Sequence, residues 1–364
     1  MIWSATRVEE IQEAVRTAPP GVRLLPLAGA TKPALSSSRR DDVEQLNLAG
    51  LSGVLEYDPA ELTITALAGT PVREVASILA EHGQYLPFDP LLPAAGATLG
   101  GVVATGASGA GAWRHGGVRD FIIGVKFVDG TGRLIAAGGK VVKNAAGFDL
   151  PKLMVGSAGR LGVITQLSFK VFPCPPATTT VEFGFDTTDR AVAGAIVLSR
   201  GPVELDALDI LPGSRLLARV GGRAETLRSR ADRLARTLDI PPTYHDGEQE
   251  RVLWRDAAEL AWSPAGAAMV RVGLSIRQLV RLEAALTLIP DVRIRYGIGG
   301  TVAWISWPAA APLDRLDTIL CDLALPGMVL LGPPDRAFLG PATGGVFGAR
   351  IVTALDPDQR FLEL

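Results

Sequence analysis

The residues of this 364-residue sequence that could do chemistry are concentrated in glycine-rich stretches of its first half. The densest of these stretches runs from Gly96 to Gly109 and begins with the sequence GATLGG. Residues with little or no side chain let the backbone approach a ligand closely, and successive N–H groups can form a concave nest for phosphate oxygens. A tight surface turn is the ordinary alternative for a single glycine cluster.

Two further stretches strengthen the binding interpretation. The turn from Ala28 to Lys32 directly follows an apolar strand expected at 22–27, and its N–H groups would be free to face a ligand. A third stretch runs from Lys143 to Thr165 and contains KNAAGFD and GSAGRLGVIT. None of the three matches the G-x-G-x-x-G or G-x-x-x-x-G-K-[ST] patterns, so a Rossmann NAD site or a Walker ATP site is not expected.

The composition excludes several other kinds of site. A formal net charge of -2 gives no basic surface for nucleic acid. The two cysteines, Cys174 and Cys321, lie far apart and form no CxxC motif, so the sequence predicts no iron–sulfur cluster of its own. The three histidines are not spaced to share a metal ion, and no metal site is expected.

The sequence also carries an expectation about location. The N-terminus lacks the basic start and apolar core of a signal peptide, which predicts a cytoplasmic protein. The uncharged window from Pro90 to Trp113 is long enough to span a bilayer, but its glycines, prolines and hydroxyls would leave the backbone poorly satisfied in lipid. We interpret this window as a ligand-binding loop.

Elements of the first half must position these stretches. The pattern predicts a helix at 6–18 with Thr6 as its cap and Glu9 in capping-box position, and a second helix opened by Thr70 as N-cap and ended by Gly83. Strands are expected at 54–57 and 62–67, a hairpin at 121–128 and 133–137, and a long strand at 161–172.

The second half begins after a proline cluster at 173–176 and alternates strands with helices. This predicts an antiparallel sheet with helices on one face. Trp304 and Trp307 lie an odd number of positions apart on one expected strand and should point to opposite faces. The fold class is therefore α+β. The expected strands are 181–185, 203–210, 216–220, 268–274, 292–296 and 301–307, and the expected helices are 224–238, 251–261, 276–288 and 313–323.

The order of the motifs between Pro26 and Pro173 resembles the PCMH-type FAD-binding domain of the vanillyl-alcohol oxidase flavoprotein family. PLAGATK, GATLGG, VRDFIIGV, VVKNAAGFDLPKLM and GSAGRLGVIT stand in the family's order and spacing. The resemblance implies a two-lobed FAD-binding domain at 1–173, followed by a smaller domain at 174–364 with an antiparallel sheet and helices. Within the family the sequence is most similar to FAD-binding subunits of bacterial glycolate oxidases.

The resemblance also implies which residues would hold FAD. The turn at 28–32 and the stretch at 96–101 would hold the pyrophosphate from two sides, and Gly162 and Ile164 would support the rest of the cofactor. No histidine lies in the first turn, so a non-covalent flavin is expected. The complete set of implied cofactor-binding residues is Ala28, Gly29, Ala30, Thr31, Lys32, Gly96, Ala97, Thr98, Leu99, Gly100, Gly101, Thr105, Asn144, Asp149, Gly162 and Ile164.

The sequence departs from the family at several positions. Val102 and Gly106 stand where many members have asparagines. Relatives that oxidise hydroxy acids unaided have a histidine-and-glutamate cluster in the second domain, whereas this half of the chain contains one histidine, His245. His115 lies nearest the glycine-rich loops, where an exposed loop histidine is the ordinary interpretation. Catalytic residues are not assigned, and the arginines that could bind a substrate carboxylate are Arg114, Arg119, Arg271, Arg293 and Arg295.

Three hypotheses about function follow from the resemblance. In the first, the chain is the FAD-binding subunit of a glycolate oxidase, in which a hydroxy-acid dehydrogenase-like flavoprotein subunit oxidises glycolate to glyoxylate and an iron–sulfur subunit receives the electrons. Such a complex could hold the chain at the inner membrane. In the second, the chain is a self-sufficient FAD-dependent D-2-hydroxy-acid dehydrogenase. In the third, it is a non-catalytic scaffold that has lost FAD.

Overall fold

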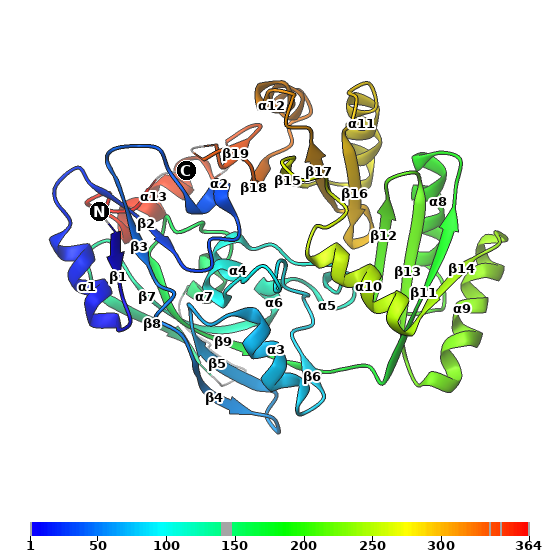
Figure 1. Ribbon diagram of the computed structural model, residues 1–364, viewed down its shortest axis with the longest axis horizontal. Helices are drawn as coiled ribbons and strands as arrows, with labels where there is room; N and C mark the ends of the chain where they lie inside the picture. The colour runs from blue at the N-terminus through cyan, green and yellow to red at the C-terminus, as the bar shows by residue number, and fades with distance from the viewer. Residues whose placement is uncertain (1, 140–147, 335, 343, 363–364) are drawn as a thin grey trace.

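The computed structural model describes residues 2–139, 148–334, 336–342 and 344–362. Figure 1 shows that the chain forms a first part with small sheets and a second part with one large sheet. This combination confirms the α+β fold class expected from the sequence.

The first part begins with a small parallel sheet. Its strands β1 (Ile2–Ser4), β3 (Val43–Asn47) and β2 (Arg23–Leu27) lie in the order β1-β3-β2. Helix α1 (Val8–Thr17) buries Ile11, Ala14 and Val15, which follow helical spacing, in the same apolar cluster as Leu24 and Leu46 of the sheet. In this lobe, β2 is followed by the turn formed by residues 28–32.

The second lobe of the first part is an antiparallel sheet with the order β4-β5-β9-β7-β8. Short helices and a small two-stranded sheet connect its strands. The strands are β4 (Val54–Asp58), β5 (Thr63–Leu67), β9 (Val163–Lys170), β7 (Ile122–Val128) and β8 (Leu134–Gly138). The connecting elements are α3 (Val72–Ala80), β6 (Gln84–Tyr85), α4 (Leu99–Thr105), α5 (Ala112–His115), α6 (Val118–Phe121) and α7 (Leu150–Met154). The other short helix, α2 (Pro33–Ser36), lies between β2 and β3, and β10 (Phe172–Pro173) follows β9 and pairs with β6.

The second part is built on an antiparallel sheet of nine strands within the described residues, ordered β14-β11-β13-β12-β16-β17-β15-β18-β19. Its strands are β11 (Ala177–Gly184), β12 (Ala207–Leu211), β13 (Arg215–Gly222), β14 (Thr243–Asp246), β15 (Ala268–Gly273), β16 (Arg293–Gly297), β17 (Val302–Trp307), β18 (Gly327–Leu331) and β19 (Phe338–Leu339). Its helices are α8 (Thr188–Ser199), α9 (Ala224–Leu238), α10 (Gly247–Ala258), α11 (Ile276–Leu286) and α12 (Leu313–Asp322), with a short 3-10 turn η1 (Ile298–Gly300). Figure 1 shows α13 (Gly345–Leu355) beside the first part of the chain.

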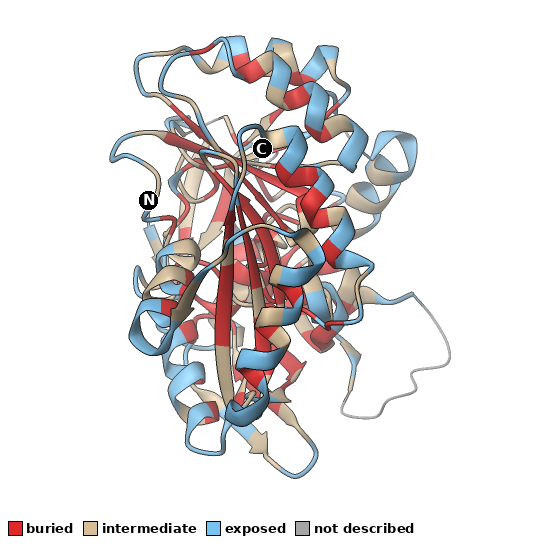
Figure 2. Cartoon of the chain, turned by 90° about the vertical axis from the view of Figure 1, so that its right-hand side faces the viewer, coloured by how far each residue is buried: buried red, intermediate tan, exposed pale blue. Residues whose placement is uncertain are grey.

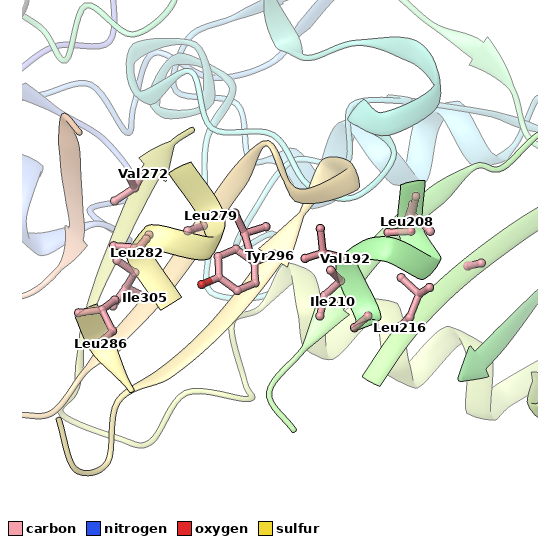
Figure 3. Close-up of a cluster of buried hydrophobic side chains, with 14 of the residues drawn as sticks. Val192, Leu208, Ile210, Leu216, Val272, Leu279, Leu282, Leu286, Tyr296 and Ile305 are labelled. Carbon is pink, nitrogen blue, oxygen red and sulfur yellow. The ribbon is translucent and has the colours of Figure 1, made fainter. Parts of the chain in front are cut away.

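The two faces of the large sheet pack against different partners. On one face, α8, α9, α11 and α12 cover a cluster that Figure 3 shows around Tyr296, Ile210 and Leu282. On the other face, Trp254 of α10 packs against Ala207, Leu211 and Leu217. The expected antiparallel sheet is confirmed, and α10 lies on the face opposite the other four helices.

The second face of the sheet also joins the first part. Met269 and Trp304 share an apolar cluster with Phe169 of β9, whereas Trp307 lies in the cluster on the helix-covered face. The two tryptophans therefore point to opposite faces, as predicted. Figure 2 shows the buried strands between helices whose outer sides are exposed.

The segment after α13 returns to the first lobe. Phe361 forms a parallel bridge with Leu24 of β2 and is 1% exposed. The carboxylate of Asp356 accepts hydrogen bonds from the N–H groups of Arg360 and Phe361, and so fixes this return. The expected domain division at residue 173 stays a prediction, and the tail lies against β2.

Two predicted caps are wrong. The N-cap of α1 is Arg7, not Thr6, and Glu10, not Glu9, accepts hydrogen bonds from the N–H groups of Thr6 and Arg7. Thr70 does not cap α3, whose N-cap is Pro71. The Thr70 hydroxyl instead donates to the carbonyl of Leu67, because this side chain is buried where the chain leaves β5.

The glycine-rich window at 90–113 is also more ordered than a loop. It contains α4, and α5 begins at its end. Thr98 caps α4 by accepting a hydrogen bond from the N–H of Gly101, and Gly106 ends the helix in a left-handed conformation with φ 60°.

Candidate cofactor-binding cleft

A cleft of about 750 Å³, counting the part open to solvent, lies between the two lobes of the first part. The turn after β2, the start of α4 and the segment leading into β9 bring their backbones together there. We name it the interlobe cleft. Its lining residues are Pro26, Leu27, Ala28, Gly29, Ala30, Thr31, Lys32, Leu35, Ser36, Leu48, Ala68, Thr98, Gly100, Gly101, Ala104, Thr105, Ala158, Gly159, Gly162 and Ile164.

The turn after β2 offers unpaired backbone donors. The N–H groups of Gly29, Ala30 and Thr31 have no hydrogen-bond acceptor among the described residues. Ala30 has φ 46°, a left-handed conformation that is uncommon for a residue with a Cβ and is typical of anion-binding nests. The turn can therefore present several N–H groups to a phosphate.

Gly29 lies against the second glycine-rich stretch. A Cβ built on Gly29 would lie 2.1 Å from the carbonyl oxygen of Gly96, so no larger residue fits without moving one of the two loops. The close contact between the backbones of Gly29 and Gly96 therefore sets how far apart these two walls of the cleft lie.

Lys32 supplies a cation to the cleft. Its side chain is 5% exposed, and its ammonium donates a hydrogen bond to the hydroxyl of Thr31 at 3.3 Å. No carboxylate among the described residues forms an ion pair with it. Burial lowers the pKa of Lys32 to about 8. A bound anion would compensate this charge.

The start of α4 contributes differently from the prediction. We expected a nest of N–H groups at 96–101, but the N–H groups of Leu99 and Gly100 donate to the carbonyls of Thr70 and Ala68. A Cβ on Gly100 would lie 2.9 Å from the Ala68 oxygen, so this glycine allows close packing. The wall is therefore mainly a surface of close backbone approach.

The third wall precedes and includes the start of β9. Gly162 has φ 140°, and a Cβ there would lie 2.7 Å from the carbonyl oxygen of Val128. Ile164 is buried and adds an apolar side chain. Ala158 and Gly159 line this wall as well, although sequence reasoning did not select them; their position between predicted residues was the available signal.

Several predicted residues do not line the cleft. Gly96, Ala97 and Leu99 lie behind its surface, where they belong to the packing of the loop. Asp149 is the N-cap of α7 and pairs with Lys152 at 3.0 Å, and it does not line the cleft. Asn144 lies outside the described residues.

A second cleft continues from Thr105 toward the large sheet. We name it the sheet-side cleft; its volume is about 850 Å³, counting the part open to solvent. The first part supplies most of its wall, and β15, η1 and β18 supply Arg271, Ile298 and Met328. The lining from the first part is Thr105, Gly106, Ser108, Ala112, Gly117, Val118, Arg119, Val155 and Gly156.

Arg271 differs from the other candidate arginines. Its side chain has no hydrogen-bond or ion-pair partner among the described residues, and burial lowers the pKa of its guanidinium. The other four are engaged: Arg114 with Asp206 and Glu204, Arg119 with the Lys152 carbonyl, Arg293 with the Trp262 carbonyl, and Arg295 with Asp209. The sequence could not single out Arg271, because its freedom depends on the packing of the sheet.

Neither candidate histidine lines the two clefts. His115 is half-buried rather than exposed, and its ring packs edge-on against Phe172. Nε2 of His245 lies 2.9 Å from the Glu182 carboxylate, but on the edge strand β14. That strand is six positions from β15 in the sheet, or about 29 Å at the usual strand spacing.

Residues 1–138 match the family model described as an FAD binding domain. The nest, the buried lysine and the glycine contacts of the interlobe cleft fit the phosphates of such a cofactor. Within the described residues, no helix is both long enough and apolar enough to cross a membrane.

Among its relatives, the glycolate oxidase subunit GlcE of Escherichia coli is 46% identical over 129 residues, covering 35% of this chain and 37% of that protein. The mitochondrial D-lactate dehydrogenase [cytochrome] 1 of Saccharomyces cerevisiae is 33% identical over 161 residues, covering 44% and 27%. The match thus spans about a third of such relatives.

A solved structure of alkyldihydroxyacetonephosphate synthase superposes on the whole chain with a TM-score of 0.72 and 16% sequence identity, covering 77% of that protein. At this identity the likeness concerns the fold. It extends beyond residue 138 and includes the large sheet.

Proposed function

We propose that this chain is the FAD-carrying subunit of an enzyme that oxidises glycolate to glyoxylate and passes the electrons to an iron–sulfur partner. The interlobe cleft carries this proposal, because it combines a nest, a buried cation and two glycine contacts in a chain similar to GlcE. FAD, when bound, supplies the group that accepts the electrons.

The residues of the interlobe cleft would hold the cofactor. The N–H groups at 29–31 and the ammonium of Lys32 would bind its phosphates, and Gly162 and Ile164 would form an apolar wall. No histidine lines this cleft, which supports non-covalent binding.

The sheet-side cleft favours a partner for the chemistry. A base is needed to accept the hydroxyl proton of a 2-hydroxy acid, and no histidine, aspartate or glutamate is among its lining residues. This composition supports a division of labour in which a hydroxy-acid dehydrogenase-like flavoprotein subunit carries out the oxidation.

One observation favours a second function, that of a self-sufficient 2-hydroxy-acid dehydrogenase. The unpaired guanidinium of Arg271 could bind a substrate carboxylate with two parallel hydrogen bonds. Chemistry in this chain would then require a proton acceptor from outside the lining residues, such as solvent.

The visible spectrum of the purified chain tests these alternatives. We expect the purified chain to show a flavin spectrum. Acid denaturation should release this flavin from the protein, and glycolate should not bleach it in the absence of oxygen. Bleaching by glycolate would overturn the proposal and favour the self-sufficient enzyme. A chain that is colourless after incubation with FAD and removal of the unbound FAD would favour the scaffold that has lost its cofactor.

Arg271 is tested by oxalate, a dicarboxylate that cannot be oxidised as a 2-hydroxy acid. If the second function holds, oxalate should perturb the flavin spectrum of the wild-type chain, and Arg271→Met should weaken its binding about tenfold or more. Arg293→Met, on the same sheet but outside the cleft, is the matched control. An unchanged oxalate affinity in Arg271→Met would contradict the carboxylate role.

A further inference from the structure

A third cavity lies between the two parts of the chain, separate from both clefts. It has a volume of about 1200 Å³, counting the part open to solvent, and shares no lining residue with either cleft. Helix α3 and the 84–93 segment form one side, and the second face of the large sheet with α10 forms the other. We name it the tryptophan cavity.

Four aromatic side chains line this cavity. Trp254, Trp262, Trp304 and Tyr85 all contribute, together with aliphatic residues from α3 and α10. Flat apolar walls of this kind favour planar apolar groups, which stack on aromatic rings and leave water.

Most polar groups that line the cavity are paired, and the exception is one nitrogen of a guanidinium. The indole N–H of Trp262 is shielded from solvent and has no acceptor among the described residues. For Arg219, Nε pairs with Glu250 at 2.7 Å, whereas Nη2 lies 3.5 Å from both Glu250 and Thr178, and Nη1 has no partner in the described part of the chain. Because the Trp262 N–H is shielded, it does not face the open space, and Nη1 of Arg219 is the donor available to an acceptor on a ligand.

The other charged groups are either paired or favour the neutral form. Asp209 pairs with Arg295 at 2.7 Å, and Arg255, at the rim, is 3.8 Å from Asp256. One oxygen of Asp89 accepts a hydrogen bond from the N–H of Gly111, and burial raises the pKa of this carboxyl. A protonated Asp89 would add one more donor.

We infer that the tryptophan cavity is a binding site for a planar, largely apolar organic anion, such as an aromatic carboxylate. The rings would enclose the apolar body, and Nη1 of Arg219 would donate to the anionic group. This inference concerns a site outside the proposed cofactor cleft and does not depend on the substrate of the enzyme.

Helix α3 allows a matched pair of variants. Ala76 and Ala80 line the cavity and are exposed, so they lie at its mouth, whereas the neighbouring Ser77 is exposed and does not line it. Ala76→Phe should narrow the mouth, and Ser77→Phe adds the same ring to the same helix outside the cavity.

The probe is naphthalene-2-carboxylate, titrated calorimetrically into the FAD-loaded chain. We expect one saturable site, affinity about tenfold lower in Ala76→Phe, and affinity within about twofold of wild type in Ser77→Phe. Loss of binding in both variants, or the absence of saturable binding in the wild type, would overturn the inference.

Two further measurements test the chemistry. Arg219→Lys keeps the positive charge beside Glu250 and removes the Nη1 donor, so it should reduce the preference for the carboxylate over uncharged naphthalene-2-carboxamide about threefold to tenfold. Equal wild-type affinities for the two probes would overturn the assignment to anions. Competition between naphthalene-2-carboxylate and FAD would place the probe in the interlobe cleft instead and would also overturn it.

Discussion

Lys32 places a positive charge where water is largely excluded, and this should make the cofactor-free chain less stable. We predict that Lys32→Met raises the free energy of unfolding of the cofactor-free chain by about 2–3 kcal/mol, because the desolvation that lowers the Lys32 pKa to about 8 disappears. The same variant should bind FAD at least about tenfold more weakly. Urea unfolding and FAD titration measure the two effects; a variant that loses stability and retains affinity would contradict both roles.

The lowered pKa of Lys32 also predicts how FAD binding depends on pH. Phosphate oxygens favour the charged ammonium, so above about pH 8 binding must take up a proton. Affinity should therefore be constant below pH 8 and fall by up to about tenfold per pH unit above it, until the pKa of the bound state is reached. The Lys32→Met variant should lack this dependence, and a wild-type affinity that is flat to pH 10 would refute the assignment.

Gly29 tests the contact between the two glycine-rich walls. A methyl group there would lie 2.1 Å from the Gly96 oxygen, so Gly29→Ala should displace one wall and lower FAD affinity by about tenfold or more. Gly184→Ala, where an added Cβ meets no atom within 4 Å, is the control and should bind FAD normally. Normal FAD affinity in Gly29→Ala would show that the contact does not shape the site.

At the scale of elements, the sequence predicted those parts whose side-chain periodicity is itself structural. The bounds of α9 match the expected 224–238 because Leu227, Ala231 and Leu234 mark one buried face. Helix α4 could not be predicted in this way, since its sequence LGGVVAT contains adjacent glycines and its stability comes from burial of Leu99, Val102 and Val103. The role of Thr70 was missed for a similar reason: its partner Gly53 lies 17 residues earlier, on a segment that the local pattern does not bring to it.

Thr70 leads to a prediction about how the elements are joined. Its hydroxyl donates to Leu67, and the N–H of Gly53 donates to it at 2.9 Å, in a fully buried position. Thr70→Val should leave the Gly53 N–H unpaired, whereas the Leu67 carbonyl keeps the backbone N–H of residue 70, and should lower the free energy of unfolding by about 1–3 kcal/mol. The exposed Thr237→Val on α9 should change it by less than about 0.5 kcal/mol. Equal urea midpoints for the two variants would show that Thr70 is dispensable.

At the scale of the whole molecule, the residues of the interlobe cleft could be predicted from the sequence, whereas those of the sheet-side cleft could not. Residues 28–32, 98–105 and 162–164 carry the glycine patterns that indicated binding, and the fold brings them to one cleft. Arg271 carries no such pattern. Its distinction is the absence of a partner in the described part of the chain, and that depends on which strands of the large sheet face the first part.

The segment around Phe361, which returns to β2, couples the second part of the chain to the interlobe cleft. Phe361 fills the core beneath β2, and Leu24 hydrogen-bonds Arg360 and Leu362 on either side of it. Phe361→Ala should therefore lower the free energy of unfolding by about 3–5 kcal/mol and weaken FAD binding, because β2 ends in the nest at 28–32. Phe347→Ala, on α13 with its side chain exposed, should change neither quantity. If Phe361→Ala lost stability but its folded fraction bound FAD with wild-type affinity, the tail would support the lobe without positioning the nest.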